Sequence, residues 1–146
     1  MTMKEETSYC FIKPEAEEHR LKIHNSLQMR GIPFTFRRVR LREIHVAGLY
    51  DIVDPALTVA TIMHLCVVPV EVIKVTCVNA VDIMLKMRGS SMNPLECEPD
   101  SFRRLYGRPE PVRISQTRLY FLNGFHAPKP KEVSVNNCLF EEEFQR

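Results

Sequence analysis

The stretch Val67–Cys77 (VVPVEVIKVTC) restricts the fold of this chain more than any other part of the sequence. It is dense in β-branched residues, which favour extended backbone, and Pro69 stands near its start. Directly after it, Asn79 is expected to cap a helix that runs through Met87, because apolar residues recur there at helical spacing. The chain is therefore expected to contain a sheet whose strands alternate with helices.

Strand and helix signals also alternate along the rest of the chain. Pro14 removes a backbone donor and so ends an early strand, while Gly31 suits the position after the end of a helix. The segment Arg88–Arg113 is rich in glycine, serine and proline and is predicted to be a long loop, which in a compact domain usually has a function. The predicted strands are Ser8–Lys13, Ile32–Leu41, Val67–Cys77 and Arg118–Leu122, and the predicted helices are Glu15–Arg30, Arg42–Val53, Ala56–Cys66, Asn79–Met87 and Asn136–Phe144.

This order of elements predicts an α/β protein of the α+β type. It matches a ferredoxin-like βαββαβ sandwich with an antiparallel sheet and extra helices between the second and third strands. A length of 146 residues is typical of one domain, so residues 1–146 are expected to fold as a single unit.

Composition excludes several classes of protein. The net charge of +2 is too small to indicate a nucleic-acid partner by itself. The five cysteines are scattered without a CxxC pair, which argues against structural zinc and for reduced thiols. The N-terminal residues lack an apolar signal region, and the apolar run Val59–Val70 is too short to span a bilayer. We therefore expect a cytoplasmic protein without a membrane partner.

A few basic residues and one histidine are candidates for chemistry. Lys13, Arg88 and Arg103 stand where loops leave predicted elements, and such residues can converge on a phosphate, although any single one is more often a solvated surface charge. His126 follows the last predicted strand, where a lone histidine is more often structural than catalytic. Its imidazole is nevertheless a candidate nucleophile, because an ordinary pKa of about 6.5 leaves it largely neutral at pH 7.

Four short motifs follow one another in a family-specific order. They are Ile12–Glu15 (IKPE), Arg30–Ile32 (RGI), Met92–Pro94 (MNP) followed after four residues by Pro99–Arg103 (PDSFR), and Asn123–His126 (NGFH). Together the motifs resemble those of nucleoside diphosphate kinases, which read I-K-P-D, R/K-G-F, T-N-P then P-G-T-I-R, and N-x-[IV]-H. The resemblance covers most of the chain.

The resemblance implies a reaction and a set of site residues. His126 is the implied nucleophile, which accepts the γ-phosphoryl group of a nucleoside triphosphate and passes it to a nucleoside diphosphate. The implied substrate-binding residues are Lys13, Tyr50, Lys86, Arg88, Arg103 and Asn123, where Lys86 and Arg88 are alternatives for one family arginine. The implied cofactor is Mg²⁺, held mainly by the nucleotide phosphates rather than by protein ligands. A homo-oligomer, taken as a hexamer, is also implied.

The sequence departs from the family at several positions. Ala127–Lys129 replaces the glycine, serine and aspartate that follow the histidine, and Leu122 replaces an arginine. The glutamate that orients the histidine would fall near Asn137, and the phenylalanine that stacks on the base would fall near Leu57 or Thr58. The region Gly107–Thr117 is an insertion whose role the sequence does not give.

Two other functions stay open at this point. The first is a catalytically weakened, kinase-like module that binds nucleotide or a protein without turnover, which the altered residues after His126 favour. The second is a single-stranded nucleic-acid binder, with stacking and phosphate contacts from Phe34, Phe36, Arg37, Arg38 and Arg40. Strand alternation puts the two phenylalanines on the face opposite Arg37, which favours a core position for them and makes a nucleic-acid partner the less favoured reading.

Overall fold

The computed structural model describes residues 4–50 and 54–145. Its strands are β1 (Glu5–Ile12), β2 (Phe34–Val39), β3 (Val70–Val78), β4 (Val112–Ser115), β5 (Arg118–Tyr120) and β6 (Phe125–His126). Its α-helices are α1 (Arg20–Met29), α2 (Glu43–Leu49), α3 (Pro55–Leu65), α4 (Ala80–Arg88), α5 (Phe102–Tyr106) and α6 (Val133–Gln145). Short 3₁₀ helices are η1 (Pro14–His19), η2 (Pro94–Glu96) and η3 (Pro130–Glu132).

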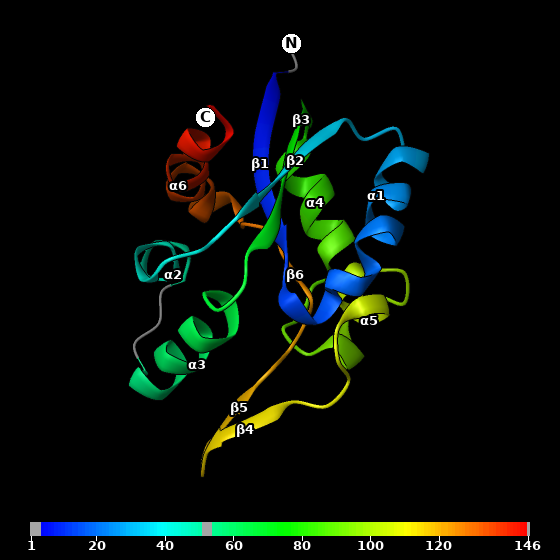
Figure 1. Ribbon diagram of the computed structural model, residues 1–146. Helices are drawn as coiled ribbons and strands as arrows, with labels where there is room; N and C mark the ends of the chain where they lie inside the picture. The colour runs from blue at the N-terminus through cyan, green and yellow to red at the C-terminus, as the bar shows by residue number, and fades with distance from the viewer. Residues whose placement is uncertain (1–3, 51–53, 146) are drawn as a thin grey trace.

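The main sheet has four strands in the order β2-β3-β1-β6, and every neighbouring pair is antiparallel. β1 and β3 pair along their whole length, from Glu5 opposite Val78 to Ile12 opposite Glu71. Helices α1 and α4 lie on one face of this sheet, and α2 and α6 lie on the other (Figure 1). The predicted ferredoxin-like sandwich with an antiparallel sheet is therefore confirmed.

Both faces of the central strands are buried, so the sheet separates two apolar cores. Along β1, Cys10 and Ile12 belong to the core beneath α1 and α4, while Tyr9 and Phe11 belong to the core beneath α6. This alternation follows from the two-residue period of an extended chain. It also explains why the last four residues of β1, from Tyr9 to Ile12, form a continuous apolar run rather than an alternating one.

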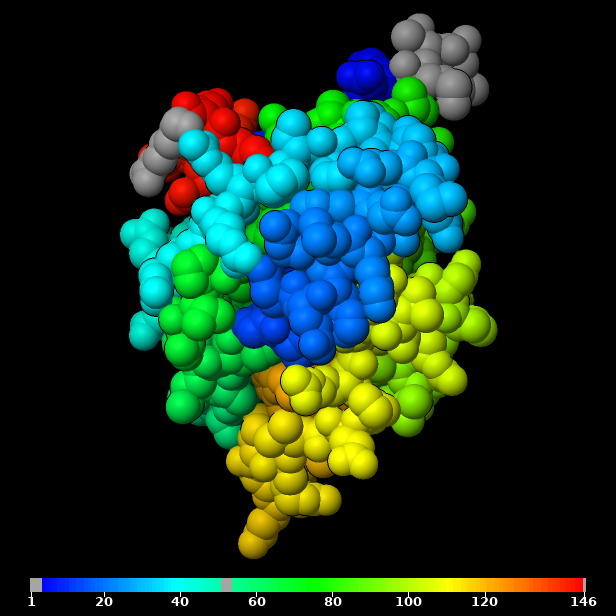
Figure 2. Space-filling view, turned by 45° about the vertical axis from the view of Figure 1, so that its right-hand side comes forward, coloured from blue at the N-terminus to red at the C-terminus, as the bar shows by residue number. Residues whose placement is uncertain are grey.

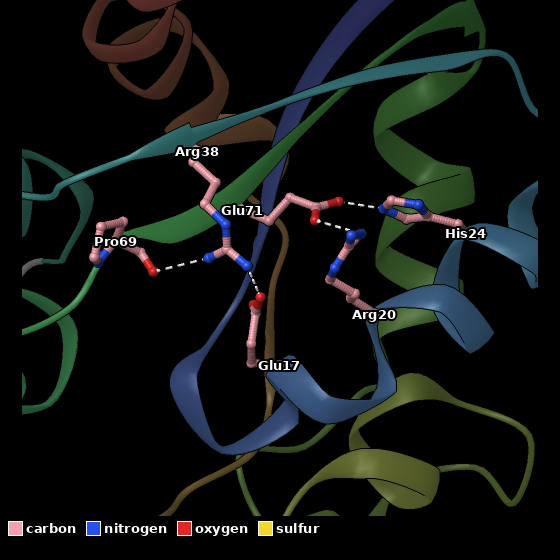
Figure 3. A network of polar contacts seen from close by, with 6 residues as sticks. All are labelled: Glu17, Arg20, His24, Arg38, Pro69 and Glu71. Carbon is pink, nitrogen blue, oxygen red and sulfur yellow. Dashed lines mark hydrogen bonds and ion pairs between the residues drawn. The ribbon is translucent and has the colours of Figure 1, made fainter.

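A buried carboxylate on β3 connects the sheet to α1. Glu71 is 1% exposed. One of its carboxylate oxygens accepts from the His24 ring, and the other lies 3.6 Å from a guanidinium nitrogen of Arg20. Beside it, Arg38 of β2 contacts Glu17 and donates to the Pro69 carbonyl (Figure 3). We call Glu71, His24 and Arg20 the Glu71 network. Its charges are satisfied within the protein.

The prediction that Arg118–Leu122 forms the last strand of the sheet is wrong. β5 pairs only with β4, in a separate two-stranded hairpin, and the fourth strand of the main sheet is β6. Gly124 lies between them with a φ of +85°, a conformation that side chains with a Cβ rarely adopt. The chain therefore turns at Gly124 and enters the sheet only at Phe125, where Phe125 and His126 pair with Ile12 and Phe11.

The long loop predicted over Arg88–Arg113 contains two short helices, so this prediction is wrong in part. The Asn93 side chain accepts from the Leu95 amide and begins η2. The Ser101 side chain accepts from the Arg104 amide and begins α5. Both are ordinary N-cap interactions that satisfy otherwise unpaired backbone donors.

Other predicted boundaries move by a few residues. β3 begins at Val70 rather than Val67, and α6 begins at Val133 rather than Asn136. Asn79 does stand before α4, but its side chain makes no capping bond, and its backbone is left-handed with a φ of +61°. The predicted helix Arg42–Val53 ends at Leu49, and its residues 51–53 lie outside the described residues. Across 4–50 and 54–145, no helix combines the length and apolar character that crossing a membrane requires.

Candidate active site

His126 lies on the short edge strand β6 and is 5% exposed. Its ring stacks on the ring of Phe11, its register partner on β1, with centroids 4.6 Å apart. The Tyr50 ring meets the imidazole edge-on at 5.6 Å. Aromatic side chains therefore cover one face of the histidine and contact its edge, and this limits rotation of the ring.

Asn136 of α6 fixes the protonation pattern of the His126 ring. Its amide nitrogen donates to the Tyr9 carbonyl at 2.8 Å, so its oxygen faces the histidine. That oxygen lies 3.3 Å from His126 Nε2 and can only accept. Nε2 therefore carries the proton in the neutral ring, and Nδ1 is left with a free lone pair.

Two arginines donate hydrogen bonds to the backbone on either side of His126. Arg103 Nε donates to the Phe125 carbonyl at 3.1 Å, and a terminal nitrogen of Arg88 donates to the Ala127 carbonyl at 2.9 Å. Carbonyls two residues apart on a strand point the same way, so both guanidinium groups lie on one side of β6. Arg88 and Arg103 are 9% and 6% exposed.

Lys13 completes a group of three buried cations. It follows β1, and its ammonium donates to the Asn123 side-chain oxygen at 2.8 Å. The Asn123 amide nitrogen in turn donates to the Met92 carbonyl at 3.2 Å. The motifs around Lys13, Met92 and Asn123, far apart in sequence, therefore meet here. We call Lys13, Arg88 and Arg103 the basic cluster.

The cations of the basic cluster form no direct ion pairs among the described residues. Within residues 4–50 and 54–145, none of the three cations forms an ion pair with a carboxylate. Burial, together with the neighbouring Arg103 and Arg88, lowers the pKa of Lys13 to about 7, against a smaller opposing effect of Glu15. Burial and Arg88 lower the pKa of Arg103 to about 10. Such unpaired buried cations are characteristic of a site that binds an anion.

The same surroundings keep His126 neutral. Burial is the main cause that holds its pKa well below the usual value, and the positive charges of Lys13, Arg103 and Arg88 add to it. The hydrogen bond to Asn136 acts in the opposite direction but does not compensate. A neutral imidazole with a free Nδ1 is the form that can act as a nucleophile.

A cavity of about 350 Å³ adjoins the basic cluster. Its polar end is formed by Lys13, Asn123 and Tyr50, whose hydroxyl is buried without a hydrogen-bond partner among the described residues. Burial raises the pKa of Tyr50, so this hydroxyl stays protonated and is a free donor. His126 does not line the cavity, but its ring contacts Tyr50, which does. The remaining lining residues are Leu57, Thr61, Met92, Leu119, Tyr120, Phe121, Lys129 and Glu132.

Lys86 lies apart from this group. Its ammonium pairs with Asp82 one helical turn away, at 3.1 Å, and its side chain is 78% exposed. Arg88, two residues later on α4, points into the protein. Residues two apart on a helix are rotated by roughly 200°, so only one of the two can face β6. Of the two sequence alternatives, the geometry brings Arg88 to the histidine.

The sequence places the residue that orients the histidine near Asn137, and in the structure the neighbouring Asn136 makes this contact. Asn137 itself donates to the Thr7 carbonyl at 3.3 Å. A signal was present, because Asn136 stands four residues before Phe140 and therefore lies on the buried stripe of α6. At the predicted position of the base-stacking phenylalanine, Leu57 lines the cavity.

The residues of the nucleic-acid hypothesis are engaged elsewhere. Arg38 contacts Glu17, Arg40 donates to the carbonyls of Cys66 and Val67, and Arg37 donates to the Glu143 carbonyl. Phe34 packs against the core beneath α1, whereas Phe36 is 53% exposed at the edge strand. The expected core position of Phe36 is therefore wrong, because β2 has no neighbour on its outer side.

Comparisons with known proteins identify the fold. Neither a protein-family model nor a curated protein matches the sequence. Solved structures do match: the nucleoside diphosphate kinase of Aquifex aeolicus has a TM-score of 0.74 at 17% identity, with 93% of this chain and 94% of that one covered. The Borrelia burgdorferi enzyme, a transition-state mimic with bound vanadate and ADP, gives 0.75 at 16%, over 95% and 88%. The Halobacterium salinarum enzyme, in complex with CDP, gives 0.73 at 14%, over 93% and 87%. The chain therefore has the fold of nucleoside diphosphate kinases.

Proposed function

We propose that this protein is a divergent nucleoside diphosphate kinase that carries the phosphoryl group on His126. One observation carries the proposal: a neutral, oriented histidine stands among three buried cations that form no ion pair with a carboxylate in the described part of the chain. A ligand rich in negative charge, such as a nucleoside triphosphate, would supply the missing charge. The shared fold and the four ordered motifs support the same reaction.

In the first half of the proposed reaction, His126 Nδ1 attacks the γ-phosphorus of a nucleoside triphosphate. A nitrogen–phosphorus bond forms as the bond from the γ-phosphorus to the bridging oxygen breaks, and a nucleoside diphosphate leaves. In the second half, a terminal oxygen of another diphosphate attacks the phosphohistidine and regenerates the free imidazole. Asn136 holds the Nε2 proton throughout, so Nδ1 needs no general base.

The surrounding residues supply position and charge, which is most of what phosphoryl transfer requires. Lys13, Arg88 and Arg103 would neutralise the phosphates, and the Tyr50 hydroxyl would donate to a phosphate oxygen. No group of three or more His, Cys, Asp or Glu side chains suited to a metal occurs in the described part of the chain. Mg²⁺ would thus take its ligands from the phosphates and water, where it neutralises phosphate charge.

Assembly and location belong to the same proposal. The family resemblance suggests a homo-oligomer, taken as a hexamer, and light scattering coupled to size-exclusion chromatography measures its mass directly. All five cysteines are free thiols, which suits the reducing cytoplasm. A mass equal to one chain at working concentration would contradict the oligomer.

Labelling with γ-³²P-ATP tests the proposed reaction. The wild type should take up an acid-labile, base-stable label and release it to added nucleoside diphosphate. His126→Gln should take up none. His19→Gln is the matched control, because His19 stacks on Tyr106 rather than facing the basic cluster. Label retained by His126→Gln would contradict the site, and no label on the wild type would contradict the activity.

A non-catalytic nucleotide-binding module is the second candidate. It is favoured by the position of His126, which is buried behind Tyr50 and does not line the cavity. Such a module would bind ADP without accepting label. Calorimetry with ADP, run beside the labelling experiment, separates the two functions.

A further inference from the structure

The β4–β5 hairpin is held outside the main sheet by very few polar contacts. An isolated two-stranded hairpin is marginally stable, so its position depends on what it packs against. The hairpin extends from the lower end of the molecule, beneath α3 and α5 (Figures 1 and 2). One contact is an ion pair between Arg118 and Asp54 at 3.0 Å, with side chains 48% and 27% exposed. Exposed pairs of this kind stabilise little.

The buried contact that holds the hairpin is a chain of three side chains. The Tyr120 hydroxyl of β5 lies 2.7 Å from His64 Nδ1, and His64 Nε2 lies 2.5 Å from a carboxylate oxygen of Glu15. The exposed fractions of the His64 and Glu15 side chains are 12% and 3%. His64 bridges the two partners, because its Nε2–H donates to the carboxylate while its Nδ1 lies within hydrogen-bond distance of the phenol.

The ionisation of the two outer groups matches this pattern. Burial alone would raise the pKa of Glu15, but the hydrogen bond and charge of His64, with Lys13, bring that pKa below its usual value. Burial raises the pKa of Tyr120 to about 12. Glu15 is thus an ionised acceptor and Tyr120 a protonated phenol, one on each side of His64.

Glu15 links this chain to the strand that carries His126. Its second carboxylate oxygen accepts from the Gly124 amide at 2.7 Å, and the Gly124 carbonyl accepts from the Lys13 amide at 2.8 Å. Both sides of the left-handed turn that leads into β6 are therefore fixed. Neither of these two bonds involves His64 or the hairpin.

The same hairpin and the residue after it supply much of the apolar lining of the cavity. Leu119, Tyr120 and Phe121 line it together with Leu57 of α3, whereas Lys13 and Asn123 belong to its polar lining. A ligand with a phosphate at one end and a flat, less polar group at the other would match this division. The hairpin residues would then contact the nucleoside and the basic cluster the phosphates.

We propose that His64 is a positioning residue. Through its contacts with Tyr120 and Glu15, which we call the latch, it holds the β4–β5 hairpin in place as the wall of the active-site cavity that contacts the nucleoside. This inference rests on the proposed function for the identity of the ligand. It assigns the insertion Gly107–Thr117 a role in binding the nucleoside, which is distinct from the role of the basic cluster in binding the phosphates. Loss of the latch should weaken binding of the nucleoside part and leave binding of the phosphate part unchanged.

Binding measurements on Tyr120→Phe and His64→Leu test the latch without requiring turnover. Tyr120→Phe removes one hydroxyl and keeps the ring. By calorimetry, each variant should bind ADP roughly tenfold more weakly than the wild type, the scale of one lost hydrogen bond, and bind pyrophosphate equally well. The double variant should be no weaker than His64→Leu alone, because the two residues act as one unit.

Tyr106→Phe is the matched control, since it removes a hydroxyl from a tyrosine that does not line the cavity and should leave both affinities unchanged. Unchanged ADP affinity in Tyr120→Phe would overturn the latch, as would an equal loss of ADP and pyrophosphate affinity. These outcomes are independent of labelling: a wild type that binds ADP and accepts no label contradicts the kinase, whereas the affinities decide the latch.

Discussion

The Glu71 network and the basic cluster are both buried groups of charged side chains, but they are balanced in opposite ways. Glu71 accepts from His24 and lies beside Arg20, so its charge is compensated inside the fold. Among the described residues, the cations of the basic cluster donate to backbone carbonyls and one amide oxygen, and Lys13 also lies over the Tyr50 ring, but none pairs with a carboxylate. The first arrangement joins β3 to α1. The second leaves positive charge next to a cavity.

The difference shows how a structural charge cluster is distinguished from a binding site. A buried charge without an opposite charge costs folding free energy, and it persists where a ligand supplies the balance. The two groups should therefore respond differently to the removal of a charge. Removal should destabilise the Glu71 network, whereas in the basic cluster it should abolish function and leave stability intact.

The largest expected effect is on activity. Lys13→Met should lower phosphoryl transfer roughly 10³-fold, because the site loses a buried cation that faces the phosphates. Its unfolding free energy at pH 6 should be no lower than that of the wild type. Burial lowers the pKa of Lys13 to about 7, so holding it protonated at pH 6 costs folding free energy that the variant avoids. Urea denaturation measures this, and a marked destabilisation would place Lys13 with the structural charges.

The second effect is on stability alone. Glu71→Gln should lower the unfolding free energy by about 3 kcal/mol, because Arg20 loses its buried counter-charge and His24 loses its carboxylate acceptor. Activity per folded molecule should persist. Asp82→Asn is the control, since it breaks the exposed pair with Lys86 and should cost no more than about 0.5 kcal/mol. Equal losses in the two variants would show that Glu71 is not a structural ion.

The third effect is a shift in pH dependence. Asn136→Asp puts a carboxylate against His126 Nε2, which favours the imidazolium and should raise the pKa of His126 by about 1–2 units. Since only the neutral ring attacks, the acid limb of the kcat/KM profile should move to higher pH by that amount. Asn137→Asp adds the same charge on a different side of α6 and should leave the limb in place. An unmoved limb in Asn136→Asp would exclude Asn136 as the residue that sets the protonation of His126.

The smallest effect is an exchange of protons on binding. With a pKa of about 7, Lys13 is largely neutral at pH 8 in the free protein. Phosphates bound beside it should raise that pKa, so ADP should bind with an uptake approaching one proton. Calorimetry in buffers of different ionisation enthalpy gives this number. Lys13→Met should abolish the uptake and Lys86→Gln should not; uptake that survives in Lys13→Met would assign the proton to another group.

The local elements could be read from the sequence because their signals are local. Proline at position 14 ended β1, Gly31 followed α1 with a φ of +69°, and the β-branched run became β3. Strand Arg118–Leu122 was misplaced for the same reason. An apolar, β-rich run indicates an extended backbone but does not indicate which strand it pairs with. Here β5 pairs with β4, and the strand that pairs with β1 after the turn at Gly124 is β6.

The sequence by itself determined the chemistry available to this protein: a histidine after an Asn-Gly turn, a lysine before Pro14, and an arginine beyond Asn-Pro, in an order that resembles one family of kinases. Only the tertiary structure decided which neighbouring residues take part. Asn136 rather than Asn137 orients the histidine, and Arg88 rather than Lys86 reaches it, because helix positions one and two apart differ in direction by about 100° and 200°. The lack of ion pairs between the basic cluster and the carboxylates of the described residues was likewise decided only by packing, since it depends on every side chain that the fold brings near.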